Sequence, residues 1–395
     1  MLKWLIAFNI NFRGEGLNLA DLREKLDKID GEIVDLFLAR MDIVKEVVRA
    51  KRETGHPTLD KARETDKLTA LTALVEDKDK DYISWLFNTI FEISRDFQAK
   101  NRDDCSVEFL KEANFKDSLS KSAKISVPGV AGSFSEHAAK VMFDLGEMAY
   151  HGSFENVFSA VCKGEVSYGV LPIENSTAGS VVEVYNLLNA HQFKIVKSVK
   201  CKISHNLAAK NSTKIGDIKE IVSHGQALWQ CEKYIKNLGQ NIKVTMAENT
   251  ATAAKMVSES ERGDIAAICS EYCADIYGLK ILDKNIQDEV HNFTRFICIS
   301  KNFEIYENSD RISILLTLPH ATGSLVQTLK HLQAQGINIL KIESRPLPGS
   351  EFEFMFYVDI KADILDKNTQ VALAQVASES ESFRILGCYE EIGED

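Results

Sequence analysis

The segment Asn292-Phe293-Thr294-Arg295-Phe296 places a hydroxyl group and a guanidinium side by side, immediately before the apolar run Ile297-Cys298-Ile299. Such a run is typical of a buried strand, and adjacent strand residues point to opposite faces. We therefore expect one of Thr294 and Arg295 to face a cleft while the other joins a separate network. The simpler alternative is a core strand with a surface arginine, because short motifs often arise by chance.

Further polar clusters lie where other strands are expected to end. Ligands of open parallel sheets bind at the carboxyl ends of strands, so these clusters are candidates to line one cleft. Their serine, threonine, asparagine and glycine residues are also ordinary in turns and helix caps, and an isolated histidine is more often structural than catalytic. The clusters cover residues 172–179, 223–228 and 248–251.

Strand and helix signals alternate between Lys124 and Phe296, which favours an open parallel sheet. The early glycines, Gly129-x-x-Gly132, are not the full dinucleotide fingerprint, and no acidic residue ends a clear second strand. The pattern therefore argues against a dehydrogenase.

Taken together, these segments resemble the prephenate dehydratase family over about residues 124–300. Gly225 stands where the family usually has proline, and Asn249 stands where serine is common; neither departure removes the proposed catalytic hydroxyl. The resemblance implies a two-lobed α/β fold similar to periplasmic ligand-binding proteins. The matching segments are Gly132-Ser133-Phe134-Ser135, Glu174-Asn175-Ser176 with Gly179, Ser223-His224-x-Gln226-Ala227-Leu228-x-Gln230-Cys231, Thr250-Ala251-x-Ala253-Ala254, Tyr277-Gly278-Leu279 and Asn292-x-Thr294-Arg295-Phe296.

The implied reaction removes carbon dioxide and hydroxide from prephenate to give phenylpyruvate. Aromatisation drives it, so the site needs a donor toward the departing ring hydroxyl and a poor environment for the ring carboxylate. By the resemblance, Thr294 is the donor, whereas Arg295 organises the site or binds a carboxylate. No cofactor or metal is implied. The residues expected to hold the substrate are Asn175, Ser176, Gln226 and Thr250.

The first hundred residues carry a different pattern. From Leu19 to about Thr54, apolar residues recur every three or four positions, as in a coiled-coil seam. Arg40 occupies a seam position and is costly there unless an anion meets it, although an arginine can also extend to the helix edge. Lys51 lies on nearly the same face, about 16 Å further along. The two cations can hold a small dianion between them.

This region resembles the all-helical chorismate mutase family over about residues 19–100. The reaction is an intramolecular rearrangement of chorismate to prephenate, so the site needs only to orient carboxylates and stabilise charge on the ether oxygen. The resemblance implies that Arg23 and Arg40 bind carboxylates, that Lys51 and Gln98 donate toward the ether oxygen, and that Glu64 accepts from the ring hydroxyl. The matching positions are Arg23, Arg40, Lys51, Asp60, Arg63, Glu64, Ser94 and Gln98.

Arg23 and Lys51 are separated by 28 residues, which corresponds to roughly 42 Å along a straight helix. They cannot serve one small ligand from the same helix. If both are catalytic, Arg23 comes from a partner chain, and the module is an interlocked homodimer or part of a higher oligomer.

The last eighty residues alternate strand and helix signals in a βαββαβ order, which predicts an α+β ferredoxin-like fold. Two segments resemble the phenylalanine-binding motifs of the ACT domain, with Ser324 where alanine is usual. The alternative is a domain used only for dimerisation. The implied L-phenylalanine-binding residues are Gly323, Ser324, Leu325, Val326, Glu343, Ser344, Arg345 and Pro346.

Composition narrows the cellular context. The net charge of −11 over 395 residues argues against nucleic-acid binding. The eight cysteines form no CxxC pair, which favours reduced thiols in the cytoplasm, and no run reaches the ~18 apolar residues of a membrane span. The expected organisation is an N-terminal extension (1–18), a helical mutase domain (19–103), a linker (104–123), a dehydratase domain (124–305) and an ACT domain (306–395).

These features predict a bifunctional enzyme of phenylalanine biosynthesis that acts on chorismate and prephenate and is inhibited by phenylalanine. Two alternatives remain open at this point. The N-terminal helices of a monofunctional dehydratase would serve only dimerisation. A non-catalytic sensor of aromatic amino acids would use the two-lobed domain only for binding.

Overall fold

The computed structural model describes residues 18–54, 61–100, 110–120, 122–239, 241–347 and 353–393, without the side chains of 51–54, 61, 99 and 100. The chain forms two compact units, Met1–Asp104 and Cys105–Asp395. All of the expected N-terminal extension except Asn18 lies outside the described residues. No helix in the described ranges combines the length and hydrophobicity needed to cross a bilayer.

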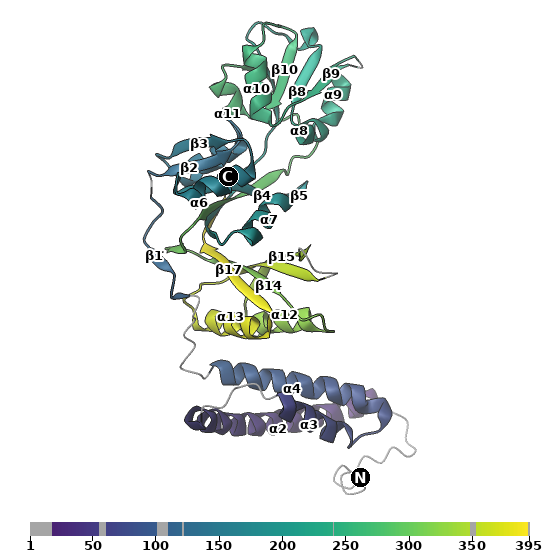
Figure 1. Cartoon of the computed structure of the whole chain (residues 1–395). Coiled ribbons are helices and arrows are strands. Elements are labelled where there is room, and N and C mark those ends of the chain that lie inside the picture. The colour runs from purple at the N-terminus through teal and green to yellow at the C-terminus, as the bar shows by residue number, and fades with distance from the viewer. Residues whose placement is uncertain are drawn as a thin grey trace. The chain divides into compact units, whose positions relative to one another are not determined.

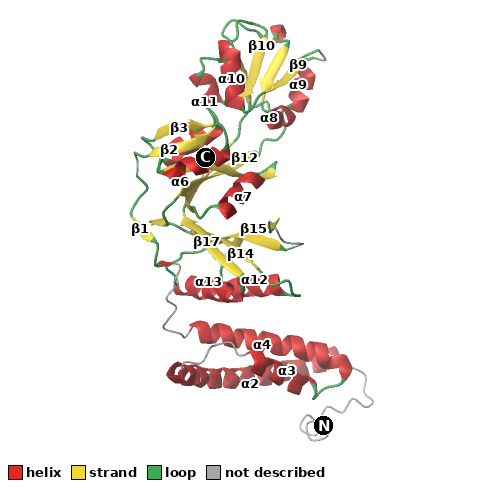
Figure 2. Cartoon of the chain, viewed as in Figure 1, coloured by secondary structure: helices red, strands yellow, loops and turns green. Residues whose placement is uncertain are grey.

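The first unit is helical, as predicted, with a long α2 (Leu19–Thr54), α3 (Lys61–Thr72), a 3-10 turn (Asp77–Asp79) and α4 (Lys80–Lys100) (Figure 2). The apolar face of α2 that is buried within the chain carries Met41, Val44 and Val48, and α4 contributes the buried Phe91. Several other apolar residues of α2, which belong to the predicted seam, are not covered within the chain. Leu26, Ile33, Leu36 and Ile43 are each more than half exposed.

The second unit begins with a lobe built on a mixed sheet (Figure 1). Its strands β2, β3 and β4 are parallel to one another, whereas β12 pairs antiparallel with both β4 and β6. The predicted open parallel sheet is therefore correct for β2, β3 and β4 and wrong for β6 and β12. The chain leaves this lobe after β6 and re-enters as β12 at the same end, where Phe293 pairs with Lys202. The bounds are β2 (Lys124–Pro128), α5 (Phe134–Met142), β3 (Glu147–His151), α6 (Phe154–Lys163), β4 (Tyr168–Asn175), β5 (Gly179–Ser180), α7 (Val182–Ala190), β6 (Lys194–Lys202) and β12 (Phe293–Ser300).

The chain crosses between the two lobes twice, at residues 203–205 and 284–292, and the residues between these crossings form the second lobe. The predicted two-lobed α/β architecture is therefore confirmed. At the crossings the backbone N–H of Ile203 donates to the carbonyl oxygen of Asn292 over 2.8 Å. The sheet order is β11-β7-β10-β8-β9. The bounds are β7 (Asn206–Ala209), β8 (Glu220–Ser223), α8 (Gly225–Gln230), α9 (Glu232–Leu238), β9 (Lys243–Met246), α10 (Thr250–Glu259), β10 (Ile265–Cys269), α11 (Glu271–Ile276) and β11 (Lys280–Asp283).

The C-terminal region has the βαββαβ order predicted for it, and its strand order β15-β16-β14-β17 is that of a ferredoxin-like sheet. Part of the segment expected as a linker is ordered: β1 (Asn114–Lys116) pairs in parallel with β13 (Glu304–Tyr306). The bounds are β14 (Arg311–Thr317), α12 (Ser324–Ala334), β15 (Asn338–Pro346), β16 (Phe354–Lys361), α13 (Lys367–Glu379), β17 (Ser382–Tyr389) and β18 (Glu391–Gly393).

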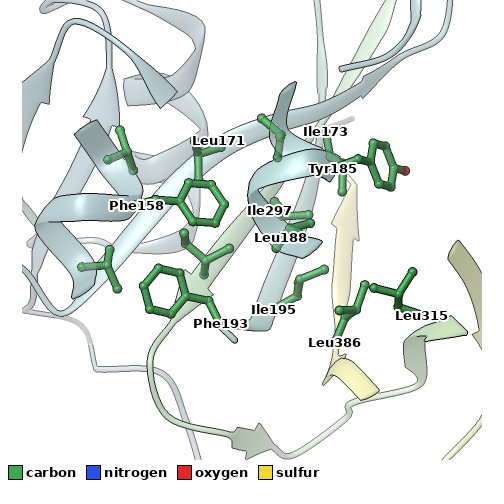
Figure 3. Close-up of a cluster of buried hydrophobic side chains, with 14 of the residues drawn as sticks. Phe158, Leu171, Ile173, Tyr185, Leu188, Phe193, Ile195, Ile297, Leu315 and Leu386 are labelled. Carbon is green, nitrogen blue, oxygen red and sulfur yellow. The ribbon is translucent and has the colours of Figure 1, made fainter. Parts of the chain in front are cut away.

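The C-terminal region and the first lobe share one continuous sheet, because β17 and β18 both pair in parallel with β6. They also share a core. Leu315 and Leu386 of the C-terminal region pack with Ile195, Leu188 and other buried side chains of the lobe (Figure 3). A hydrophobic core that spans both parts makes independent movement of the two costly.

We expect Gly387→Ala to destabilise this junction severely. A Cβ at Gly387 would lie 2.0 Å from the carbonyl oxygen of Ile195 on β6, and a backbone atom cannot move aside as a side chain can. Overpacking of this kind costs about 3 kcal/mol. Thermal unfolding followed by near-ultraviolet circular dichroism should show a lower midpoint. Gly263→Ala, where a Cβ meets nothing within 4 Å, is the control; equal midpoints for the two variants would contradict the prediction.

Candidate active sites

Asn175 and Thr294 meet where the first lobe borders the crossings. Asn175 is the last residue of β4, and strand register places it directly opposite Thr294 of β12. Its amide nitrogen Nδ2 donates to Thr294 Oγ1 over 2.9 Å and to Asn292 Oδ1 over 2.8 Å. All three side chains are buried. The hydroxyl of Thr294 and the amide of Asn175, which were each predicted as site residues, are therefore in direct contact.

The direction of the Asn175–Thr294 hydrogen bond follows from the neighbouring backbone. Asn175 Oδ1 accepts from the N–H groups of Thr177 (3.0 Å) and Ala178 (2.8 Å), which can only donate. The other side of the amide must be the donor, so Thr294 Oγ1 accepts. The Thr294 hydrogen is left without a protein acceptor among the described residues. The hydroxyl is thus oriented to donate to a ligand.

The second lobe reaches this cluster through Gln230, at the end of α8. Its Nε2 donates to Thr177 Oγ1 over 2.8 Å, and its Oε1 accepts from Asn292 Nδ2 over 3.1 Å and from His205 Nε2 over 2.9 Å. Gln230 and Asn292 lie inside motifs that the sequence singled out, but neither was predicted as a site residue. Thr177 and His205 carried no separate signal.

Burial lowers the pKa of His205 below its ordinary 6.5, although its hydrogen bond with Gln230 acts in the other direction. The unfolded chain therefore takes up a proton before the folded chain as the pH falls below about 6.5, and the free energy of unfolding decreases. We expect the thermal unfolding midpoint to drop between about pH 7 and about pH 5, and to drop less in His205→Asn. Parallel pH profiles of the two proteins would contradict this.

The other residues predicted to hold the substrate have more varied positions. Ser176 forms its hydrogen bonds with backbone groups. Its Oγ donates to the His291 carbonyl oxygen over 3.2 Å and accepts from the Phe293 N–H over 2.9 Å. Gln226 and Thr250 are half-buried residues of the second lobe, at the start of α8 and α10 respectively. These two are better placed than Ser176 to contact a ligand.

Turns of the two lobes approach each other beside α10. A Cβ at Gly129 would lie 3.5 Å from the side chain of Asn249, which caps α10, and a Cβ at Gly132 would lie 3.0 Å from Cys273 Sγ. Both glycines have positive φ angles, 94° and 84°, which other residues rarely adopt. The glycines allow this close approach of the lobes.

Arg295 points away from the hydroxyl cluster, as the alternation of strand residues predicts. Its NH1 donates to Asp359 Oδ2 over 2.5 Å, its NH2 donates to the Tyr389 hydroxyl over 2.6 Å, and its Nε lies 2.6 Å from Glu391 Oε2. All three partners belong to the C-terminal region. The guanidinium therefore faces the C-terminal region, which suits the predicted role of organising the site better than contact with a substrate carboxylate.

A second polar site lies in the helical unit. Arg40 NH1 donates to Ser94 Oγ, and the guanidinium lies 5.8 Å from the centre of the Phe91 ring. Burial lowers the pKa of Arg40, while the charge of Glu64 raises it. Gln98, one turn beyond Ser94 on α4, has a buried Oε1 that accepts no hydrogen bond. A half-buried cation and a neighbouring unpaired amide oxygen suit a small polar ligand.

The remaining mutase candidates are less well placed within one chain. Arg23 and Arg63 are exposed, and Asp60 and the side chain of Lys51 lie outside the described residues. Glu64 forms an ion pair with Arg95, whose NH1 lies 2.6 Å from Glu64 Oε2. Sequence reasoning missed Arg95, which lies next to Ser94 and has the ordinary appearance of a surface helix residue.

The two predicted effector motifs lie at the same end of the C-terminal region, because α12 and β15 run in opposite directions after a short turn. Gly323 (φ 89°) caps α12, followed by Ser324, Leu325 and the exposed Val326. On β15, Ser344 and Pro346 are exposed, whereas Glu343 and Arg345 point to the other face. There Glu343 Oε2 accepts from Ser180 Oγ over 2.9 Å, and Arg345 lies over the Tyr185 ring.

The chain matches the model of the prephenate dehydratase family over residues 125–304 and that of chorismate mutase type II over residues 22–99. It is 31% identical over 385 residues to the bifunctional chorismate mutase/prephenate dehydratase of Escherichia coli (strain K12), covering 94% of this chain and 96% of that relative. The similarity therefore includes both compact units.

Two other relatives each match about two thirds of the chain. Arogenate dehydratase/prephenate dehydratase 1, chloroplastic, of Arabidopsis thaliana is 39% identical over 283 residues, 67% of this chain and 71% of its own. The crystal structure of prephenate dehydratase from Arthrobacter aurescens in complex with L-Phe is 27% identical with a TM-score of 0.62, covering 67% of this chain and 89% of that one. The fold of the dehydratase and C-terminal parts is thus shared with a solved structure.

Proposed function

This chain belongs to the bifunctional chorismate mutase/prephenate dehydratases, and we propose that it performs both reactions in phenylalanine biosynthesis. Chorismate is rearranged to prephenate in a domain spanning residues 19–103. Prephenate loses water and carbon dioxide in a domain spanning residues 124–305, and L-phenylalanine binds an ACT domain spanning residues 306–395. The hydroxyl group of Thr294, held with its hydrogen free, is the observation that carries the dehydratase assignment.

In the dehydratase step, Thr294 donates its hydroxyl hydrogen to the departing ring hydroxyl of prephenate, which leaves as water. The bond to the ring carboxylate breaks, its electron pair enters the ring, and carbon dioxide is released. The hydrogen bond from Asn175 Nδ2 stabilises the negative charge that develops on Thr294 Oγ1. The threonine then regains a proton from solvent.

The substrate is a dianion in a chain of net charge −11, so local donors must hold it. The amino end of α10, where Thr250 is the first residue, supplies free backbone N–H groups and a favourable dipole. Gln226 of the same lobe can contribute its amide. We assign these two residues to the pyruvyl carboxylate, while Asn175 serves Thr294 and Ser176 holds the backbone of the crossing.

In the mutase step, Arg40 binds a carboxylate of chorismate and Gln98 lies at the ether oxygen, with Lys51 as the second donor. Gln98 Oε1 accepts no hydrogen bond among the described residues, so a rotation of the amide that presents Nε2 in its place loses none at Oε1. Ser94 supports Arg40, and Glu64 accepts from the ring hydroxyl. Asp60 and Arg63 complete the set carried over from the family.

The mutase site is completed by a second copy of the chain. Arg23 lies 17 residues before Arg40 on the same helix, about 25 Å away, so it cannot reach the same chorismate. The uncovered apolar residues of α2, which include Leu26, Ile33 and Leu36, give the second copy a surface to cover. We infer a homodimer or higher oligomer in which Arg23 of one chain serves the site of the other.

Phenylalanine regulation rests on the C-terminal motifs. The turn at Gly323–Val326 and the exposed Ser344 and Pro346 lie at one end of the region, beside the exposed Ile342 and Phe354. An amino acid bound there is held by backbone groups of the turn. The relative from Arthrobacter aurescens was crystallised in complex with L-Phe, which supports the choice of effector. The cysteines described all have free thiols, which supports a cytoplasmic location.

The purified full-length chain tests the whole proposal. Chorismate consumption is followed by its ultraviolet absorbance and phenylpyruvate by its own, with and without L-phenylalanine. Turnover of prephenate but not of chorismate would leave a monofunctional dehydratase with dimerising helices. Ligand binding without turnover of either would leave a sensor. Both activities, with the second inhibited by phenylalanine, are expected.

A further inference from the structure

Arg95 joins α4 to the first turn of α3 beside the other residues of the mutase site. Its NH1 donates to Oε2 of Glu64 over 2.6 Å, and its side chain is only 14% exposed. Glu64 is the residue to which the proposed function gives the ring hydroxyl of chorismate. Arg95 itself has no role in that proposal, although it lies next to Ser94 and three residues before Gln98 on the same helix.

The contact with Arg95 holds one of the two carboxylate oxygens of Glu64. A guanidinium can only donate, so Oε2 of Glu64 is the accepting atom of this pair. Oε1 accepts no hydrogen bond among the described residues, and it is the oxygen that remains for the ring hydroxyl of a substrate. A free glutamate side chain loses conformational entropy when it is fixed. The ion pair with Arg95 imposes part of that loss before the substrate arrives.

The charge of Glu64 also acts on Arg40, on α2. Burial lowers the pKa of Arg40 and this carboxylate raises it, while NH1 of Arg40 donates to Ser94 Oγ. Each of the three helices thus contributes a charged side chain to one cluster. The position of the Glu64 carboxylate therefore affects both the acceptor for the ring hydroxyl and the cation that binds a carboxylate of chorismate.

Two buried polar atoms of α4 set this cluster apart from an ion pair that only joins helices. Among the described residues, Nε of Arg95 donates no hydrogen bond and Oε1 of Gln98 accepts none, although both atoms are buried. Residues three positions apart on a helix are neighbours. Buried polar groups are normally satisfied within a fold, and unsatisfied ones call for a ligand, a water molecule or a catalytic role. The surroundings of Arg95 are therefore those of a binding site.

We propose that Arg95 is a positioning residue of the chorismate mutase reaction, which holds the Glu64 carboxylate so that Oε1 accepts from the ring hydroxyl. This inference rests on the proposed function. A misplacement of about 1 Å at a group that contacts the reacting molecule can cost on the order of 10²-fold in rate. The carboxylate contacts of chorismate remain when Arg95 is replaced, so the loss should appear in kcat more than in KM.

The alternative is that Arg95 and Glu64 only fasten α3 to α4. Partly exposed ion pairs contribute little to stability, so this alternative predicts a slightly lower unfolding midpoint and an unchanged kcat at temperatures well below it. The Glu64 side chain is 31% exposed, so it can be hydrated when Arg95 is lost and the helical unit should still fold.

Val48→Ala is a matched control for stability. Val48 is buried on α2 and carries no polar group in its side chain. Its truncation should lower the unfolding midpoint by several degrees, because it removes buried methyl groups. It leaves Arg95 and Glu64 unchanged, so the wild-type kcat for chorismate should be retained.

The test compares Arg95→Met and Arg95→Lys with Val48→Ala in the full-length chain. Chorismate consumption gives kcat and KM, phenylpyruvate formation from added prephenate reports on the other compact unit, and thermal unfolding gives the midpoint. We expect kcat to fall at least about tenfold in Arg95→Met, with KM within about threefold and dehydratase activity unchanged. Arg95→Lys keeps a cationic donor for Glu64 and should recover most of the loss.

A double variant shows whether Arg95 acts through Glu64. In a Glu64→Ala background the carboxylate is absent, so Arg95→Met should lower kcat by less than about twofold further, whereas independent roles would multiply the two losses. Multiplied losses, an unchanged kcat in Arg95→Met, or an equal loss in Val48→Ala would each overturn the inference alone. A wild-type chain that does not consume chorismate would overturn the mutase part of the proposed function and this inference together.

Discussion

Thr294→Val is expected to abolish prephenate dehydration while mutase activity is retained. Valine keeps the shape of threonine but has no hydroxyl to donate to the leaving group. We expect kcat to fall on the order of 10³-fold, the effect of removing one well-placed group from a transition state. The fold should lose only about 1 kcal/mol, since Asn175 Nδ2 still donates to Asn292 Oδ1. Phenylpyruvate formation and chorismate consumption by the same protein are the measurements.

Thr294→Ser is the matched control, because it keeps the hydroxyl and loses only a methyl group. It should retain activity within about tenfold, since serine has greater rotational freedom. Valine and serine variants of equal activity would show that the hydroxyl of Thr294 does not take part. Loss of mutase activity in Thr294→Val would show that the two reactions are not independent.

The opposed directions of Thr294 and Arg295 were predictable from the sequence because a strand alternates regardless of its partners. The direction of the hydrogen bond between Asn175 and Thr294 could not be predicted in this way. It depends on two backbone N–H groups, those of Thr177 and Ala178, which turn back onto Asn175 after β4. Periodicity describes which face a side chain occupies, and carries no information on which atom of an amide faces a hydroxyl.

The contacts made by residues of the crossings and of distant domains could not be predicted from the sequence either. Gln230 of the second lobe contacts His205 of the first crossing and Asn292 of the second, which lie far apart in the sequence. Asp359 and Glu391 resemble ordinary strand residues, and their partner Arg295 lies 64 and 96 positions before them. The helices of the first unit were predicted from spacing, but the spacing could not show which apolar face of α2 the chain itself covers.

Arg40→Met is expected to remove chorismate mutase activity without unfolding the helical unit. Arg40 is the cation that the structure places beside Ser94 and within the field of Glu64, where a carboxylate of chorismate can bind. Losing one such donor costs about 10²–10³-fold in rate. Phenylpyruvate formation from added prephenate should be unchanged, because the dehydratase residues lie in the other compact unit.

The stability of the same variant separates a functional arginine from a structural one. Burial lowers the pKa of Arg40, which means that the fold disfavours its charge. Methionine of similar length should pack against Phe91 without that penalty, and replacements of this kind are often neutral or stabilising. We therefore expect an equal or higher unfolding midpoint together with lost activity. A lower midpoint with retained mutase activity would show that Arg40 is a packing residue. The helices would then serve dimerisation.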